Sequence, residues 1–182
     1  QTRTLNTYYE MAGDGVPVLI LSGTGSDLRK KPTVLDSPLT ADFNVISYDQ
    51  RGLGQSEKPQ DGYTMAAYAE DAAALMDALE IESAHVLGIS FGGMVAQEFA
   101  LAYPNRLKRL ALFCTSPGGS GGISYPLHEL EHLDLENRAK TMLLLGDTRI
   151  DDNVIKTNPE LVEVTMARLD RSEFAREDGH AR

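Results

Sequence analysis

The sequence predicts an α/β fold: a mostly parallel sheet with flanking helices, followed by a further helical segment. Four short runs rich in Val, Ile and Leu each end at a turn-forming residue, which is typical of strands buried on both faces of a sheet. Segments with helical periodicity separate the later runs, and strands that alternate with helices indicate βαβ units with right-handed crossovers.

The predicted strands are the four apolar runs themselves. They cover residues 16–21, 43–48, 84–89 and 107–114. Cys114 closes the last run, where an unpaired cysteine is expected to be a small buried hydrophobe. An earlier stretch, Arg3 to Glu10, alternates weakly and predicts an antiparallel edge strand.

Two helices of the core are predicted from apolar residues at helical spacing. Thr64 can cap the first helix. Its apolar stripe is Tyr68, Ala72, Leu75 and Leu79. The second helix is predicted over residues 91–103 and ends before Pro104. Its stripe is Val95, Phe99 and Ala102.

The chain is predicted to divide into a core, residues 1–117, and a connector with part of a helical lid, residues 118–182. The connector is the flexible run Pro-Gly-Gly-Ser-Gly-Gly at 117–122. Behind it, Asp134 can cap a helix, and Asn158 with Pro159 marks the start of another. Their apolar stripes are Leu135, Ala139 and Met142, and then Val162, Met166 and Leu169.

The composition excludes several classes of protein. The 182 residues are 42% hydrophobic and 24% charged, as in an ordinary globular domain, and the net charge of −10 argues against nucleic-acid binding. A single cysteine allows no intrachain disulfide and no cysteine-based zinc cluster. No apolar run reaches the ~20 residues of a membrane span, and no signal peptide is visible, so a cytoplasmic location is expected.

The motif that carries chemistry is Gly88-Ile89-Ser90-Phe91-Gly92, which reads G-x-S-x-G. It follows a predicted strand directly and begins a predicted helix, the setting of a nucleophile elbow that presents a serine hydroxyl at the end of a sheet. The competing interpretation is a helix-capping serine in a glycine-rich turn. The context favours Ser90 as a nucleophile, with the helix N-terminus behind it facing developing negative charge.

A second turn, Ser22-Gly23-Thr24-Gly25, follows the first predicted strand of the parallel sheet. Such a turn can aim a backbone N–H at the same point as the N–H of Phe91, and two donors of this kind form an oxyanion hole. Phosphate binding is the alternative for a glycine-rich turn. The third glycine of a dinucleotide fingerprint and any G-K-[ST] sequence are missing, so nucleotide binding is excluded.

A third loop, Asp49-Gln50-Arg51-Gly52-Leu53-Gly54-Gln55-Ser56, ends another predicted strand. Charged residues there either line a site or fix the loop through hydrogen bonds, and the structural role is favoured.

In order and spacing, these three loops and Tyr103-Pro104-Asn105-Arg106 resemble the α/β-hydrolase superfamily, in particular its lid-bearing esterase-like members. The resemblance covers residues 16–117 and, more vaguely, the helices behind them. It implies that Ser90 is the nucleophile and that the N–H groups of Phe91 and Thr24 are the oxyanion donors. Ser22-Gly23 stands where many members have His-Gly. A serine nucleophile also argues against the dehalogenase and epoxide hydrolase branches, which use an aspartate.

The catalytic triad that the resemblance implies is incomplete in this chain. In the superfamily an acid and then a histidine follow the nucleophile. The alternative acid position, after the last predicted strand, holds Thr115 and Ser116. His128 and His132 are expected to be surface residues of a helix, and His180 lies near the chain end. The triad acid and histidine are therefore expected in a segment beyond Arg182.

The resemblance implies a hydrolase that forms an acyl-enzyme on Ser90 from an ester, thioester, lactone or activated C–C bond. No cofactor or metal is expected. The expected partner is a small, hydrophobic acyl substrate, and a C-terminal remainder of the same protein is a further candidate. Two alternatives stay open: a cofactor-free, haloperoxidase-like perhydrolase that uses the same triad, and a non-catalytic hydrolase relative that binds a small molecule or a protein.

Overall fold

The computed structural model describes residues 5–118 and 125–170, apart from the side chain of His128. The chain forms two compact units, of which the first ends at Ile123 and the second begins at Ser124. The predicted glycine connector at 117–122 therefore lies largely outside the described residues.

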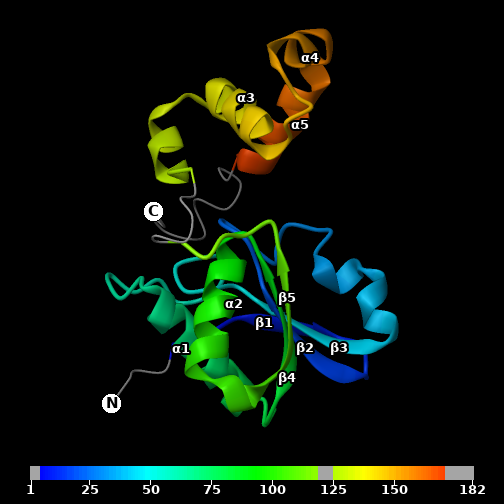
Figure 1. The fold of residues 1–182 in the computed structure, drawn as a ribbon, viewed down its shortest axis with the longest axis vertical. Coiled ribbons are helices and arrows are strands. Elements are labelled where there is room, and N and C mark those ends of the chain that lie inside the picture. The colour runs from blue at the N-terminus through cyan, green and yellow to red at the C-terminus, as the bar shows by residue number, and fades with distance from the viewer. Residues whose placement is uncertain (1–4, 119–124, 171–182) are drawn as a thin grey trace. The chain divides into compact units, whose positions relative to one another are not determined.

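The first unit is built around a five-stranded sheet (Figure 1). Its strands are β1 (Tyr9–Ala12), β2 (Val16–Leu21), β3 (Phe43–Tyr48), β4 (Ala84–Ile89) and β5 (Leu107–Phe113). They lie in the order β1-β3-β2-β4-β5, with β1 antiparallel to β3 and every other pair parallel. The mostly parallel sheet is therefore confirmed, and β2, β3 and β4 have the predicted bounds.

The two faces of the sheet are covered unequally. Leu19 and Leu21 of β2 face helices α1 (Met65–Ala78) and α2 (Phe91–Ala102), which lie together on one side (Figure 1). Val18 and Ile20, which alternate with them, pack instead against the short 3₁₀ turns η1 (Val34–Asp36) and η2 (Pro38–Ala41). The larger core lies under the two helices, and both helices were predicted from their periodicity.

The ends of these helices follow from particular residues. The Thr64 hydroxyl accepts a hydrogen bond from the Ala67 N–H at 3.2 Å and caps α1, as predicted. On α2, the prediction that Ala102 belongs to the apolar stripe is wrong, because Ala102 is exposed. The next position on the buried face, four residues after Phe99, is Tyr103, whose ring lies 5.4 Å from the Phe99 ring.

The predicted antiparallel edge strand near the N-terminus is present, but it begins later in the sequence than predicted. It begins at Tyr9 and not at Arg3, and it pairs with Val45 to Tyr48. Tyr8 stands opposite Asp49 in the register of this pair, and its carbonyl accepts from Asp49 N–H at 3.0 Å. Its N–H donates instead to Ser56 Oγ at 2.8 Å, so the strand pairing ends at Tyr8, where the Ser56 hydroxyl ties the loop after β3 to the residue before β1.

The prediction that the fourth run is buried on both faces is also wrong. β5 is the last strand of the sheet, and Phe113 at its end is 53% exposed. Cys114, expected to be buried, is exposed and has a left-handed backbone with φ 41°. An apolar run predicts a strand without showing whether another strand lies beside it.

The second unit consists of helices: η5 (Leu127–His132), α3 (Leu135–Gly146), α4 (Asp152–Thr157) and α5 (Pro159–Leu169). Ala139, Ile155 and Val162 form its small core. The predicted cap is confirmed, since the Asp134 carboxylate accepts from Asn137 N–H at 2.9 Å. Within the described ranges, no helix is long and apolar enough to cross a membrane.

One helix of the second unit was not predicted, and it changes the role of Asn158. This helix, α4, is capped by the Asp151 carboxylate, which accepts from Val154 N–H at 2.8 Å. Asn158 precedes α5 as predicted, but its side chain makes no cap hydrogen bond there. Its Nδ2 donates instead to Val154 O, at 2.9 Å, and so holds the end of α4.

Candidate active site

Ser90 occupies the turn between β4 and α2 with φ 54° and ψ −119°. A residue with a Cβ rarely adopts a positive φ, because such a conformation costs about 1–3 kcal/mol and persists only where the surroundings impose it. Here the surroundings do so, because Ser90 N–H donates to Phe113 O and Ser90 O accepts from Gly93 N–H, both at 2.9 Å. The structure therefore places Ser90 at a strained strand-to-helix turn, as the G-x-S-x-G motif predicts.

The glycines of the motif are required by close packing of backbone on backbone. A Cβ added to Gly92 would lie 1.9 Å from Leu21 O, and one added to Gly88 would lie 2.6 Å from the Cα of Gly93. Neither neighbour is a flexible side chain that can move away. The elbow consequently rests directly on the end of β2, the strand that leads into the other predicted functional turn.

That turn, Ser22 to Gly25, lies beside the candidate nucleophile. The position of a Cβ on Gly23 is 3.5 Å from the Cβ of Ser90. Gln50, which is 1% exposed, donates from Nε2 to Ser22 O at 2.8 Å and fixes the start of the turn. Thr24 itself is exposed. The structure thus brings the two predicted turns together, and the N–H groups of Thr24 and Phe91 remain the predicted oxyanion donors.

A pocket of about 320 Å³ opens beside the same turn. Ser22, Gly23 and Ile89 line it on the side of the elbow. Buried Asp27, paired at 2.6 Å with Arg29, lines it further away. The pocket adjoins the turn after β2 and the last residue of β4, and both polar and apolar side chains line it, while Ser90 is not one of them.

The loop after β3 is held by its own carboxylate. Asp49 accepts from Leu28 N–H at 2.8 Å through Oδ1 and from Gln55 N–H at 2.9 Å through Oδ2. Burial raises the pKa of this carboxyl group, against the effect of the two backbone hydrogen bonds. A Cβ on Gly54 would lie 2.1 Å from Asp49 Oδ2, so the loop closes tightly over the carboxylate. These contacts agree with the structural role that the sequence favours.

Arg51, in the same loop, forms a buried ion pair with Asp71 of α1. Its Nε and Nη2 donate to the two carboxylate oxygens at 2.6 and 2.7 Å. The two side chains are only 10% and 9% exposed, and the hydrogen bond to Asp71 raises the pKa of Arg51. The guanidinium also lies 5.8 Å from the centre of the Tyr68 ring, whose edge meets Phe91. This pair therefore joins the loop, α1 and the residue that follows Ser90.

We expect Asp71→Asn to lower the free energy of unfolding of the first unit by about 3 kcal/mol, because it leaves the buried Arg51 cation without its counter-charge. Chemical denaturation followed by circular dichroism measures this. Asp147→Asn is the matched control: it breaks a similar Arg–Asp pair, with Arg149, whose side chain is 88% exposed. The control is expected to leave the unfolding midpoint unchanged. Equal effects of the two variants would contradict a stabilising role for the buried pair.

The structure places none of the described histidines as a partner of Ser90. His85 lies at the opposite end of β4, where the centroid of its ring is 6.1 Å from that of Phe43 and the two rings are nearly perpendicular. His132 is an exposed residue of η5, as expected, and His180 lies outside the described residues. Thr115, at the alternative acid position, donates from Oγ1 to Ser90 O at 2.8 Å. Sequence reasoning examined this position for an acid and missed its contact with the elbow.

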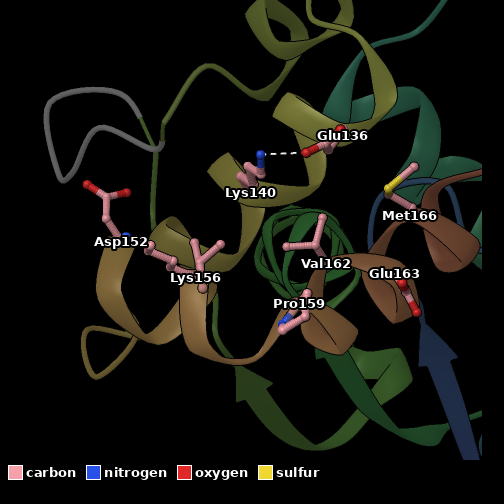
Figure 2. Close-up of a pocket in the computed structure, with 9 residues that line it drawn as sticks. Glu136, Lys140, Asp152, Lys156, Pro159, Val162, Glu163 and Met166 are labelled. Carbon is pink, nitrogen blue, oxygen red and sulfur yellow. Dashed lines mark hydrogen bonds and ion pairs between the residues drawn. The ribbon is translucent and has the colours of Figure 1, made fainter.

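The second unit carries a pocket of its own, of about 670 Å³, among α3, α4 and α5 (Figure 2). Val162 and Met166 give it apolar walls, and Glu136 pairs with Lys140 at 2.6 Å beside it. It presents no nucleophile at a strained turn. Across residues 5–118 and 125–170, no three His, Cys, Asp or Glu side chains are grouped to hold a metal ion.

Comparison with known proteins decides the family. The profile of the alpha/beta hydrolase fold matches residues 16–175, most of both units. The chain belongs to the α/β-hydrolase fold family. This α/β hydrolase has the mostly parallel sheet and the elbow position that its sequence predicts, and its relatives and structural neighbours include hydrolases.

Three similarities give the context of this α/β hydrolase. It is 38% identical over 117 residues to the 2-hydroxymuconate semialdehyde hydrolase of Pseudomonas putida, covering 63% of this chain and 40% of the relative. Est816, a structure described as an N-acyl homoserine lactone degrading enzyme, is 25% identical with a TM-score of 0.67, covering 93% of this chain and 64% of that one. A hydrolase from Pseudomonas aeruginosa PA01 is 29% identical with a TM-score of 0.67, covering 97% and 68%.

The chain spans about two fifths of the length of the curated relatives it matches.

Proposed function

We propose that this α/β hydrolase cleaves an ester or related acyl bond through an acyl-enzyme on Ser90. The observation that carries the proposal is the positive φ of Ser90 at the strand-to-helix turn, held by backbone contacts on both sides. Strain of this kind persists where the surrounding structure over-determines it, which is a property of functional sites. The turn also leaves the serine side chain beside the glycine-rich turn after β2.

The proposed reaction has two steps. The Ser90 hydroxyl oxygen bonds to the carbonyl carbon while its proton passes to a base, and the bond to the leaving alcohol breaks as the alcohol takes that proton. Water then attacks the acyl-enzyme in the same way and releases the acid. The N–H groups of Thr24 and Phe91 would hold the oxyanion in both steps, where each donor is worth about 10²–10³ in rate.

The base and the acid that orients it are proposed to come from sequence beyond Arg182. Two observations support this. The curated relatives are more than twice as long as the matched segments. β5 has exposed apolar residues, Leu110, Leu112 and Phe113, at the edge of the sheet, which suits pairing with a further strand.

We propose that the protein recognises its substrate through a hydrophobic acyl group. Leu144 and Leu145 at the end of α3 and Val164 of α5 are 39%, 45% and 53% exposed. Exposed apolar side chains on a small helical unit favour contact with an apolar ligand. The lactone named for Est816 is one example of an acyl compound of this kind.

The test is to treat protein expressed from its complete coding sequence with a fluorophosphonate that carries an alkyl chain. Intact mass under denaturing conditions is measured before and after. We expect one adduct, which peptide mapping assigns to Ser90 and which Ser90→Ala abolishes. An unlabelled wild-type protein, or an adduct that persists in Ser90→Ala, would overturn the proposal and favour a non-catalytic relative that binds a ligand.

A further inference from the structure

The end of β5 makes a second set of contacts with the elbow, beyond the strand pairing. Ile89 and Phe113 are the last paired residues of β4 and β5. Ser90, the residue after Ile89, donates from its N–H to Phe113 O at 2.9 Å. Thr115, two residues after Phe113, donates from Oγ1 to Ser90 O at 2.8 Å. Both peptide groups of the strained serine are therefore held by the same short segment.

The left-handed backbone of Cys114 stands between these two contacts. Its φ of 41° is one of only three positive values at non-glycine residues in the described part of the chain, and Ser90 is another. The turn at Cys114 takes the chain out of the strand direction, and the Thr115 side chain reaches back to the elbow. Ser90 and Cys114, which follow the neighbouring strands β4 and β5, thus both have unfavourable backbone conformations.

Thr115 also occupies the space that a side chain at Gly93 would need. A Cβ on Gly93 would lie 2.5 Å from both the Cβ and Oγ1 of Thr115. The Gln97 side chain adds a further link, because its Nε2 donates to Gly93 O at 3.1 Å and to Ser116 O at 3.0 Å. The first turn of α2 and the segment after β5 are therefore packed and hydrogen-bonded together around Ser90.

We infer that Thr115 is a positioning residue that holds the Ser90 elbow in its reactive conformation through the hydrogen bond from Oγ1 to Ser90 O. This inference rests on the proposed function of Ser90. A strained residue keeps its geometry only while its contacts outweigh the strain, so each lost contact lets the elbow relax. A relaxed elbow misplaces the nucleophile, and a misplacement of about 1 Å costs on the order of 10²-fold in rate.

Thr115→Val and Thr115→Ser separate the hydrogen bond from the packing. Valine keeps the shape against Gly93 and loses the hydroxyl, whereas serine keeps the hydroxyl and loses only the methyl group. In the full-length protein we expect Thr115→Val to lower the maximal rate of fluorophosphonate inactivation by about 10-fold. The concentration of probe at half-maximal rate is expected to stay unchanged, and Thr115→Ser to stay within about 2-fold of wild type.

Thr165→Val is the matched control, because Thr165 Oγ1 donates to Leu161 O at 2.8 Å in the second unit. It is expected to leave the inactivation rate unchanged. Amide hydrogen exchange of the peptide that contains Ser90 and Gly93 is measured in the same proteins, and faster exchange is expected only in Thr115→Val.

The outcomes distinguish the two proposals. Inactivation of Thr115→Val at the wild-type rate, or of Thr115→Ser as slowly as Thr115→Val, overturns the positioning role while Ser90 remains the nucleophile. If wild-type Ser90 is not labelled, the proposed function fails, and hydrogen exchange decides the positioning role alone. Equal exchange at the elbow in wild type, Thr115→Val and Thr115→Ser then overturns it.

Discussion

Replacing Ser90 with alanine is expected to lower the hydrolysis of an activated ester by about 10⁴-fold or more, since the covalent intermediate can no longer form. Replacing it with glycine is expected to lower activity equally and, in addition, to give a protein that is more stable than the alanine variant. The two variants share the loss of the hydroxyl and differ in whether a Cβ remains at the strained position.

The gain in stability follows from the backbone of Ser90. With φ 54° and ψ −119°, the serine pays a conformational cost of about 1–3 kcal/mol that glycine does not pay. Glycine loses about 0.5–1 kcal/mol more chain entropy on folding than alanine, so part of the gain is offset. We therefore expect Ser90→Gly to exceed Ser90→Ala in free energy of unfolding by about 1 kcal/mol.

Two measurements on the full-length protein check this. Hydrolysis of 4-nitrophenyl butyrate gives the loss of activity, and urea denaturation followed by circular dichroism gives the order of stability. Residual turnover in Ser90→Ala above about one thousandth of wild type would contradict the nucleophile. Equal stability of the glycine and alanine variants would show that the elbow stores no strain.

The sequence predicts the central part of this fold well, because the signals there are local. β2, β3 and β4 are short runs rich in Val, Ile and Leu that are bounded by turns, and α1 begins at its predicted cap, Thr64. What surrounds an element is not a local property. The exposure of Phe113 and Cys114 depends on whether another strand lies beside β5, and periodicity carries no information about this.

The same distinction applies to the candidate site. Ser90 and the turn at Gly23 are recognisable because glycines next to a strand end are a pattern within a few residues. The contact of Thr115 with Ser90 joins residues 25 positions apart, and a threonine after a strand has no pattern of its own. The contact of Gln50 with Ser22 O, which fixes the turn, joins residues 28 positions apart and was missed for the same reason.

Gly92→Ala is expected to destabilise the first unit strongly, because the added methyl group meets backbone atoms and not side chains. Its Cβ would lie 1.9 Å from Leu21 O and 2.5 Å from Ser22 O. Both are backbone atoms at the end of β2, so relief requires that α2 move away from the sheet. Overpacking usually costs 1–3 kcal/mol, and because neither neighbour can rotate away we expect a loss of about 3 kcal/mol or more in the first unit.

Gly146→Ala is the control for Gly92→Ala, because it also adds a methyl group to a helical glycine. Nothing lies within 4 Å of a Cβ at Gly146, and alanine favours the helix, so this variant is expected to gain up to about 1 kcal/mol. The two changes lie in different units, and their effects on stability are expected to add in the double variant.

If Gly92→Ala unfolds at the wild-type urea concentration, the contact between the elbow and the end of β2 is looser than the structure shows. The turn at Ser22 and Gly23 would then no longer be fixed relative to Ser90, and the oxyanion hole would lose its structural basis.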